Sequence, residues 1–186
     1  MRYLLDTNVF ISGARCFYPM NVFPGFWEWL AYEHKKGEFI IIDKVFHELQ
    51  TGDELAIWTR NHITPISTNT PLITQEYCNV IQWTRDRVRG RRNERRYQPA
   101  AVNTFAMCAD SYLIAYAKAK DCIVVTYEKE ENKASEVKIP TICQDLHIAC
   151  IKGFELFKTL NPVFTWEPAD DETVDPSRIQ FKDMTD

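Results

Sequence analysis

The sequence predicts an α/β protein in which a mainly parallel sheet lies between layers of helices. Three short apolar runs are typical of buried strands: Tyr3–Leu5, Phe39–Ile42 and Ile123–Val125. Segments with helical spacing of apolar residues follow these runs along the chain. This alternation indicates β-α-β units, whose strands pair in parallel.

A helix is expected over Pro24–Tyr32, where a Pro–Gly pair precedes aromatic residues at helical spacing. Phe26, Trp29 and Leu30 fall on one face, because they are separated by three and four positions. Gly37 is expected to close this helix.

The rest of the chain continues the alternation. Asp43 is expected to cap a helix, and Gly52 to end or kink it. Pro65 and Pro71 predict a loop over residues 63–74, with at most a short strand, because proline disrupts a regular helix. The remaining expected elements are helices over Asp53–Asn61, Gln75–Asp86, Cys108–Lys120, Thr141–Leu146 and Phe154–Leu160, and strands over Lys138–Pro140 and Ile148–Ile151.

The composition is that of one globular domain with a tail. The 186 residues are 45% hydrophobic and 26% charged, which excludes a mostly disordered chain, a fibre or a coiled coil. No run approaches the roughly 18 apolar residues of a membrane span, and the N-terminus lacks the apolar run of a signal peptide. We therefore expect a cytoplasmic protein with no membrane partner, a domain over residues 1–164, and an acidic, irregular or disordered tail over residues 165–186.

Two familiar kinds of site lack support in the sequence. The six cysteines form no CxxC pair, which argues against a zinc knuckle or a thioredoxin-like motif and favours reduced thiols. No GxGxxG or Walker-type loop occurs, which argues against a nucleotide cofactor on a glycine-rich turn.

The charges are unevenly distributed along the chain. The net charge is −4, yet residues 167–186 carry −5 and the arginine-rich stretch over residues 85–96 carries +5. Such a basic segment can bind RNA phosphates, and the flanking Trp83 and Tyr97 could stack on unpaired bases. A solvated helix face and contact with an acidic partner protein are the alternatives. The candidate RNA-binding residues are Arg85, Arg87, Arg89, Arg91, Arg92, Arg95 and Arg96.

Four acidic residues are expected at one edge of the predicted sheet. Asp6 and Glu128 follow two of the expected strands. Glu48 lies about one turn into the helix after the second strand, and Asp110 is at the beginning of a helix. Parallel α/β sheets bind ligands outside the carboxyl ends of their strands. Carboxylates gathered there repel one another, and a hard cation such as Mg²⁺ or Mn²⁺ relieves that repulsion. The sequence therefore predicts a metal site that can support attack on a phosphodiester.

Each acid also has an ordinary structural explanation. Asp6 could cap the following helix, and Asp110 could be an N-cap or first-turn acid. Glu48 and Glu128 could be solvated side chains, and Glu130 or Glu131 could take the place of Glu128.

Several motifs resemble a known family. The segments "YLLDTNVFI", "ADSYLIAYA" and "VVTYE" are similar to the three motifs of PIN domains, metal-dependent ribonucleases of which many are toxins of toxin–antitoxin pairs. The segments "FPGFWEWL", "VFHELQTGDELAIW" and "KIPTICQDLHIACIKGFELF" resemble one uncharacterised PIN-like subfamily. The resemblance extends over about residues 2–164.

The resemblance implies a three-layer α/β/α fold and an acidic site that binds Mg²⁺ or Mn²⁺. It matches Asp6, Glu48 and Asp110 to acids of the family motifs, and Glu128 stands where many members have Asp. Thr126 matches the threonine of the last motif. Asn8 matches the polar residue after the first acid, where it would hold Asp6 and its loop by hydrogen bonds, although a simple turn asparagine explains it equally.

The functional hypothesis is a metal-dependent endoribonuclease, the toxin of a type II toxin–antitoxin pair. Asp6 and Asp110 would hold the principal ion, and Glu48 and Glu128 would complete the site or hold a second ion. Its partners would be RNA and an antitoxin protein, and related toxins suggest a homodimer. The alternatives are a PIN-like protein that binds RNA or a partner without cleaving, and a DNA or structure-specific nuclease.

Overall fold

The central sheet has four strands, all parallel. The computed structural model describes residues 2–50, 52–88, 97–131 and 133–164. The strands form a sheet in the order β2-β1-β3-β4, with Tyr3 opposite both Phe39 and Ile123. The strands are β1 (Tyr3–Leu5), β2 (Phe39–Ile40), β3 (Ile123–Val125) and β4 (Cys150–Ile151). The predicted α/β class with a parallel sheet is therefore confirmed.

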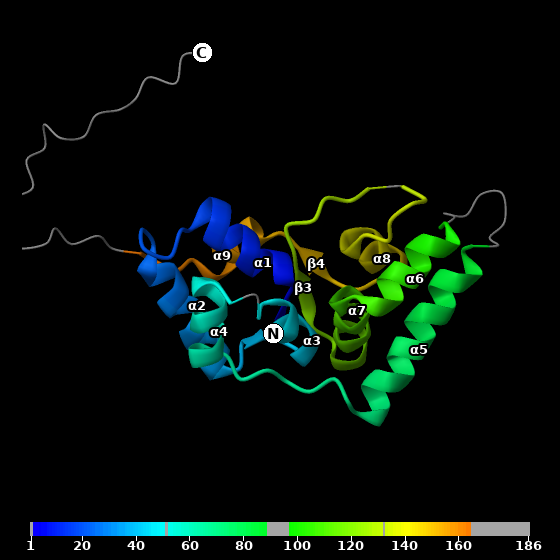
Figure 1. Cartoon of the computed structure of the whole chain (residues 1–186), viewed down its shortest axis with the longest axis horizontal. Coiled ribbons are helices and arrows are strands. Elements are labelled where there is room, and N and C mark those ends of the chain that lie inside the picture. Colours follow the sequence, from blue (N-terminus) through cyan, green and yellow to red (C-terminus); the bar gives the residue numbers. More distant parts are fainter. Residues whose placement is uncertain (1, 51, 89–96, 132, 165–186) are drawn as a thin grey trace, which may run out of the picture.

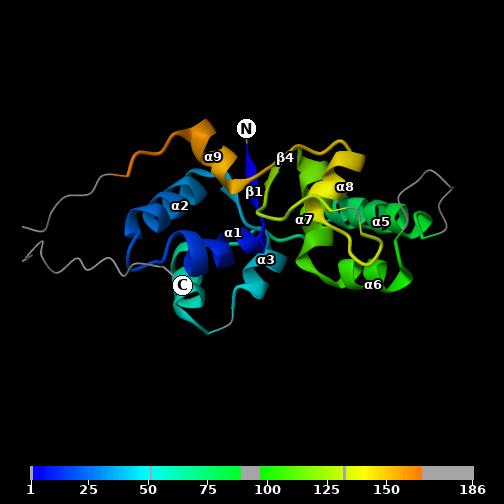
Figure 2. The same cartoon turned by 90° about the horizontal axis from the view of Figure 1, so that it is seen from above.

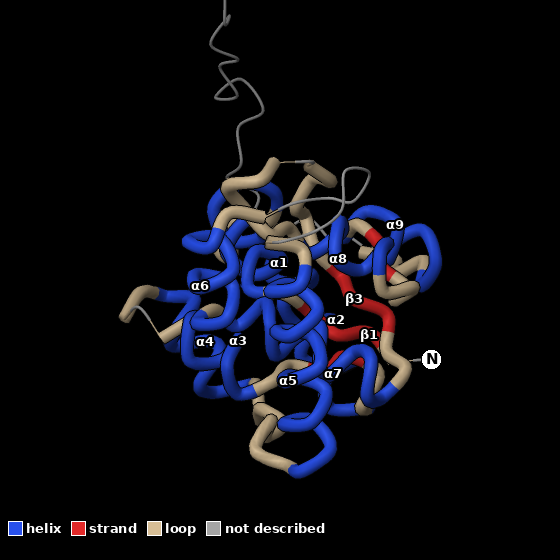
Figure 3. Tube along the Cα trace, turned by 90° about the vertical axis from the view of Figure 1, so that its right-hand side faces the viewer, coloured by secondary structure: helices blue, strands red, loops and turns tan. Residues whose placement is uncertain are grey.

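Helices cover both faces of this sheet. Figures 1 and 2 show α1, α2 and α9 on one side of the strands and α5, α6, α7 and α8 on the other, and Figure 3 shows the strands enclosed between them. The helices are α1 (Thr7–Ser12), α2 (Pro24–Lys36), α3 (Asp43–Glu48), α4 (Glu54–His62), α5 (Pro71–Asp86), α6 (Pro99–Met107), α7 (Ala109–Lys120), α8 (Ile139–Asp145) and α9 (Gly153–Leu160), and a π-helical turn, η1 (Gly13–Phe17), follows α1.

The core surrounds the two central strands. Leu4 and Leu5 of β1 and Val124 and Val125 of β3 are completely buried, because helices lie on both faces. This is the physical reason why these strands are continuous apolar runs rather than alternating ones. Within the described part of the chain, no helix combines the length and apolarity that crossing a bilayer requires.

The second strand is shorter than predicted. Regular pairing covers only Phe39–Ile40 of the expected Phe39–Ile42. The two residues after β2 pair instead with Ile66. The Ile66 N–H donates to the Ile41 carbonyl at 2.9 Å, and Ile42 and Ile66 form an isolated parallel bridge. The short strand considered for residues 63–74 is thus reduced to a single bridge along the outer edge of β2.

Two expectations about helix starts are wrong. The predicted loop over residues 63–74 ends at Pro71, which is the first residue of α5, because proline lacks only an N–H that the first helical turn leaves unpaired. Asp43 is not the N-cap of α3, a position that Ile42 occupies. The Asp43 carboxylate instead accepts hydrogen bonds from the Thr68 hydroxyl at 2.7 Å and the Thr68 N–H at 3.1 Å.

Two helices on the α7 side differ from the expectation. The strand predicted over Lys138–Pro140 is wrong, since α8 begins at Ile139 and has Pro140 in its first turn. Helix α6, Pro99–Met107, was not predicted, and it too begins with a proline. The predicted tail, residues 165–186, lies outside the described residues.

Candidate functional site

Asp6 lies at the carboxyl end of the central strand β1 and is buried, with 4% of its surface exposed. Its backbone occupies the N-cap position of α1, but its side chain makes no capping hydrogen bond. The Thr126 hydroxyl, just beyond β3, donates to Asp6 Oδ2 at 2.7 Å. The carboxylate is therefore held toward the neighbouring strand end and does not act as a helix cap.

Asn8 joins the same two strand ends. Its Nδ2 donates to the Thr126 hydroxyl at 2.9 Å, and its Oδ1 accepts from the Tyr127 N–H at 2.9 Å. The Thr126 hydroxyl also accepts from the Glu128 N–H at 3.0 Å. Asn8 and Thr126 therefore fix the position of Asp6 relative to the segment that carries Glu128.

Glu48 ends α3 and is exposed, yet both of its carboxylate oxygens have partners. Oε2 accepts from the Thr7 hydroxyl at 2.5 Å, and Oε1 accepts from the Ala109 N–H at 3.1 Å. These contacts join the start of α1 to the start of α7. Glu48 is thus not simply a solvated side chain, because it holds two elements of the site together.

Asp110 lies in the first turn of α7, where it faces the other acids. Burial and the charges of Glu128 and Glu48 raise the pKa of Asp110 to about 7. Burial and the charge of Asp110, with a smaller contribution from Glu128, raise the pKa of Asp6 to about 8 against the lowering effect of Thr126. Four carboxylates that come from distant parts of the chain therefore repel one another across a shared site.

Glu128, rather than its acidic neighbours, belongs to this cluster. Its Oε2 accepts from the Ile139 N–H at 2.9 Å, and its Oε1 lies 3.3 Å from the Lys138 ammonium. Glu130 is exposed, and Glu131 forms an ion pair with Lys133 at 2.8 Å. The alternative in which Glu130 or Glu131 replaces Glu128 is therefore not supported. We name Asp6, Glu48, Asp110 and Glu128 the acidic cluster.

The acidic cluster has the oxygen ligands of a magnesium site, but its side chains are not already arranged around one ion position. Among residues that the structure describes, no three His, Cys, Asp or Glu side chains are arranged to hold an ion together. Glu48 and Glu128 accept hydrogen bonds from backbone N–H groups. Burial and neighbouring charges raise the pKa of Asp6 to about 8 and that of Asp110 to about 7. Mg²⁺ commonly binds one or two carboxylates and completes its shell with water and phosphate, so this oxygen-only pair fits it.

Two clefts open on the acidic cluster. One, of about 360 Å³, lies between α6 and the segment after β3, and Asp110, Glu128, Thr104 and Lys138 are among its lining residues. The other, of about 590 Å³, extends from Glu128 across the ends of β3 and β4 to the start of α9. The cluster is therefore accessible from both helical layers.

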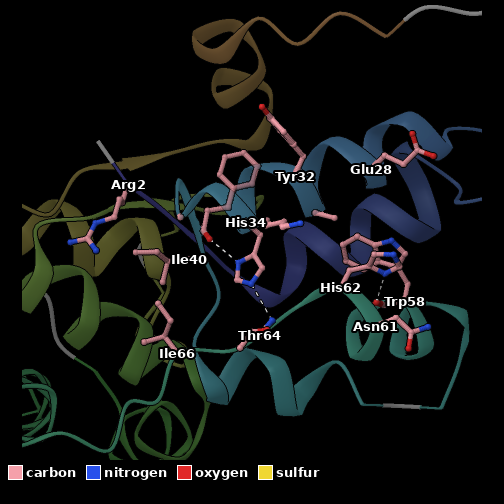
Figure 4. A pocket seen from close by; sticks show the side chains of 14 residues that line it. Arg2, Glu28, Tyr32, His34, Ile40, Trp58, Asn61, His62, Thr64 and Ile66 are labelled. Carbon is pink, nitrogen blue, oxygen red and sulfur yellow. Dashed lines mark hydrogen bonds between the residues drawn. The ribbon is translucent and has the colours of Figure 1, made fainter.

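A larger cavity, of about 880 Å³, lies at the opposite end of the strands (Figure 4). The His34 ring spans part of it, with Nδ1 2.9 Å from the Phe39 carbonyl and Nε2 accepting from the Thr64 N–H at 3.1 Å. Glu28 is the one carboxylate among the described residues that line it. This cavity therefore lacks the acidic chemistry of the other edge.

The arginine-rich segment is only partly described. Arg85 is exposed at the end of α5, whereas the Arg87 guanidinium lies 3.4 Å from the centre of the Trp83 ring. Tyr97 is 3% exposed, so the expectation that its ring stacks on a base is wrong. Trp83 has its face covered by Arg87. Five predicted residues lie outside the described ranges: Arg89, Arg91, Arg92, Arg95 and Arg96.

Two contributors to the site were not predicted. Thr7 binds Glu48, and Lys138 is 3.3 Å from Glu128 and 2.9 Å from Glu136. Thr7 directly follows Asp6, so a polar residue beside the first acid was an available signal. Nothing in the sequence pattern marks Lys138, because its role depends on how the segment after β3 folds back.

Comparison with known proteins gives a family without an assigned activity. No curated protein matches this chain. One family model matches residues 3–164, which is most of the chain and includes all four members of the acidic cluster. The chain therefore belongs to the DUF4411 family, which is described as a domain of unknown function.

Proposed function

We propose that this protein is a metal-dependent endoribonuclease related to the PIN-like nucleases. The observation that carries the proposal is the acidic cluster, in which Asp6 is buried at the end of β1 and the charge of Asp110 raises its pKa. Burying charged carboxylates together is unfavourable unless a cation or protons neutralise them. The raised pKa values of this pair are what a site adapted to a divalent cation would have before the cation binds.

Asp6 and Asp110 would hold the principal Mg²⁺ or Mn²⁺ ion. Glu48 and Glu128 would complete its shell, directly or through water, or bind a second ion. A bound ion of this type lowers the pKa of a water molecule and stabilises charge on a phosphodiester. Asn8 and Thr126 keep Asp6 oriented through their hydrogen bonds, so these two residues support the site without touching substrate.

The partners of this activity are also part of the proposal. The substrate would be RNA, gripped in part by exposed arginines such as Arg85, whose phosphate contacts would be independent of sequence. The protein would act in the cytoplasm as a toxin, be neutralised by an antitoxin protein, and form a homodimer. The motif resemblance supports these points.

The test is cleavage of mixed RNA by the purified protein with Mn²⁺, Mg²⁺ or EDTA. We expect cleavage with either metal and none with EDTA or with the D6N variant. D86N is the matched control, because Asp86 is an exposed acid at the end of α5 and is not a member of the acidic cluster. Single-stranded DNA in the same assay separates a ribonuclease from a DNA nuclease. Intact RNA with folded wild-type protein and both metals would refute the proposal.

A protein that binds RNA or a partner without cleaving it is the second candidate. It is favoured by the backbone N–H groups that donate to Glu48 and Glu128, because these hydrogen bonds stabilise the two carboxylates without an ion. Intact RNA with both metals, in a preparation of folded protein, would support this second candidate.

A further inference from the structure

One ammonium group contacts the acidic cluster. Lys138 directly precedes α8, and its Nζ lies 3.3 Å from Glu128 Oε1 and 2.9 Å from Glu136 Oε2. The side chains of Lys138 and Glu128 are 26% and 19% exposed, whereas that of Glu136 is 50% exposed. Water screens an exposed charge pair more strongly than a partly buried one, so the contact with Glu128 is the less screened of the two.

Glu128 differs in this respect from the other acids. Within the described ranges, it is the one member of the acidic cluster that forms an ion pair. Glu48 accepts hydrogen bonds from a hydroxyl and a backbone N–H, and Asp6 accepts one from the Thr126 hydroxyl, and none of these donors is charged. The chain therefore supplies a counter-charge to Glu128 that it does not supply to the other three acids.

Charge, rather than hydrogen bonding, limits ion binding at Glu128. A carboxylate oxygen that accepts one hydrogen bond keeps a lone pair for an ion, so the Ile139 N–H on Oε2 does not by itself block the residue. A divalent ion bound directly to Glu128 would share this carboxylate with the Lys138 ammonium. The two positive charges would repel each other, most strongly where water is partly excluded.

The cleft that opens on Glu128 is acidic apart from this ammonium. Lys138 is the one cationic side chain among the described residues that line the cleft of about 360 Å³, and the acids that line it are Asp110, Glu128 and Glu136. The ions of a two-metal site lie about 4 Å apart, close enough for neighbouring carboxylates to bind both. Lys138 thus places positive charge on the side of the acidic cluster where such a second ion would need Glu128.

We propose that Lys138 takes the place of a second metal ion, so that the acidic cluster binds a single divalent cation through Asp6 and Asp110. Lys138 acts through Glu128 and is therefore a positioning residue. The proposal rests on the proposed function, because it concerns the ion that Asp6 and Asp110 would hold. It selects the one-ion form of that site over the two-ion form.

The test counts the ions that the full chain binds. Mn²⁺ is titrated by calorimetry, and electron paramagnetic resonance at saturation shows whether two Mn²⁺ ions lie close enough for their spins to couple. K138M and K138Q remove the ammonium, whereas K138R keeps the charge. K133M is the matched control, because Lys133 is 59% exposed and pairs with Glu131, outside the acidic cluster. E136Q removes the other ion-pair partner of Lys138 and leaves its charge in place.

We expect one Mn²⁺ ion on the wild type, K138R, K133M and E136Q, and two spin-coupled ions on K138M and K138Q. The first ion should bind about tenfold more tightly to K138M than to the wild type, because a nearby like charge has been removed. The double variant K138M/E128Q should return to one ion, because the second ion needs the Glu128 carboxylate.

Two coupled ions on the wild type would overturn the proposal, as would a single ion on both folded neutral variants. Two ions on K138R would also overturn it, since the charge of the side chain would then not matter. Two ions on a wild type that cleaves RNA would leave the nuclease proposal standing. One ion on the wild type and two on K138M, without RNA cleavage, would support the role of Lys138 while refuting the nuclease. A folded wild type that binds no ion would overturn both proposals.

Discussion

Replacing Asp6 with asparagine should remove a pH-dependent loss of stability. The pKa of Asp6 rises from 3.8 to about 8 on folding, chiefly because of burial and then the charge of Asp110. The folded protein therefore keeps a proton that the unfolded chain releases. The stability associated with this proton is complete below pH 3.8 and is lost as the pH rises through about 8.

The magnitude follows from the size of that window. Because the folded state holds one proton that the unfolded state releases, each rise of one pH unit lowers the free energy of unfolding by up to about 1.4 kcal/mol. From pH 5 to pH 8 the loss is about 4 kcal/mol. D6N keeps an oxygen that can accept from Thr126 but carries no charge. We expect D6N and wild type to be similar at pH 5 and D6N to be more stable at pH 8.

Urea unfolding in EDTA at a series of pH values measures this effect. D86N is the control, since the Asp86 carboxylate is exposed and accepts a hydrogen bond from Gln82 at 2.7 Å. We expect the D86N stability profile to follow that of wild type. Parallel profiles for D6N and wild type would show that Asp6 is not held among repelling charges, and the electrostatic basis of the proposed metal site would then be lost.

Three further results are expected. Divalent-ion affinity measured by calorimetry should rise between about pH 6 and pH 8, by up to tenfold per pH unit for each proton that the ion displaces from the acidic cluster. An affinity that does not change with pH would contradict the raised pKa values. G153A should destabilise the fold by roughly 1–3 kcal/mol in urea because its methyl group overlaps Tyr127, whereas G25A, with ordinary contacts in α2, should not. T126V should lower the free energy of unfolding by about 1–3 kcal/mol at pH 8.5, because it leaves buried Asp6 without its hydroxyl donor; an unchanged urea midpoint would argue against this contact.

The sequence predicted those elements whose signal is local. β1 and β3 are continuous apolar runs, and α2 has both a proline start and a terminal Gly37 in the left-handed conformation. The starts of α5, α6 and α8 were misjudged or missed because proline interrupts a helix interior but suits the first turn. Periodicity alone does not distinguish these two positions.

The geometry of the candidate site was predictable only in part. Asp6 and Thr126 follow strands that pair directly, so their proximity follows from the topology of a parallel sheet. The contacts of Glu48 with Thr7 and with the Ala109 N–H depend on how α3 packs between α1 and α7, which no sequence pattern specifies. The stacking role expected for Tyr97 failed for the same reason, because a flanking position in sequence does not determine which side of a ring faces solvent.

The outer border of β2 also influences how copies of the protein behave at high concentration. Over residues 39–42 this border is occupied by His34, which is close to the Phe39 carbonyl, and by residue 66, which binds on both sides of the Ile42 bridge. A neighbouring molecule that approached to add its own strand would first have to displace these groups. The His34 ring and the segment around residue 66 thus oppose edge-to-edge aggregation at the β2 edge of the sheet.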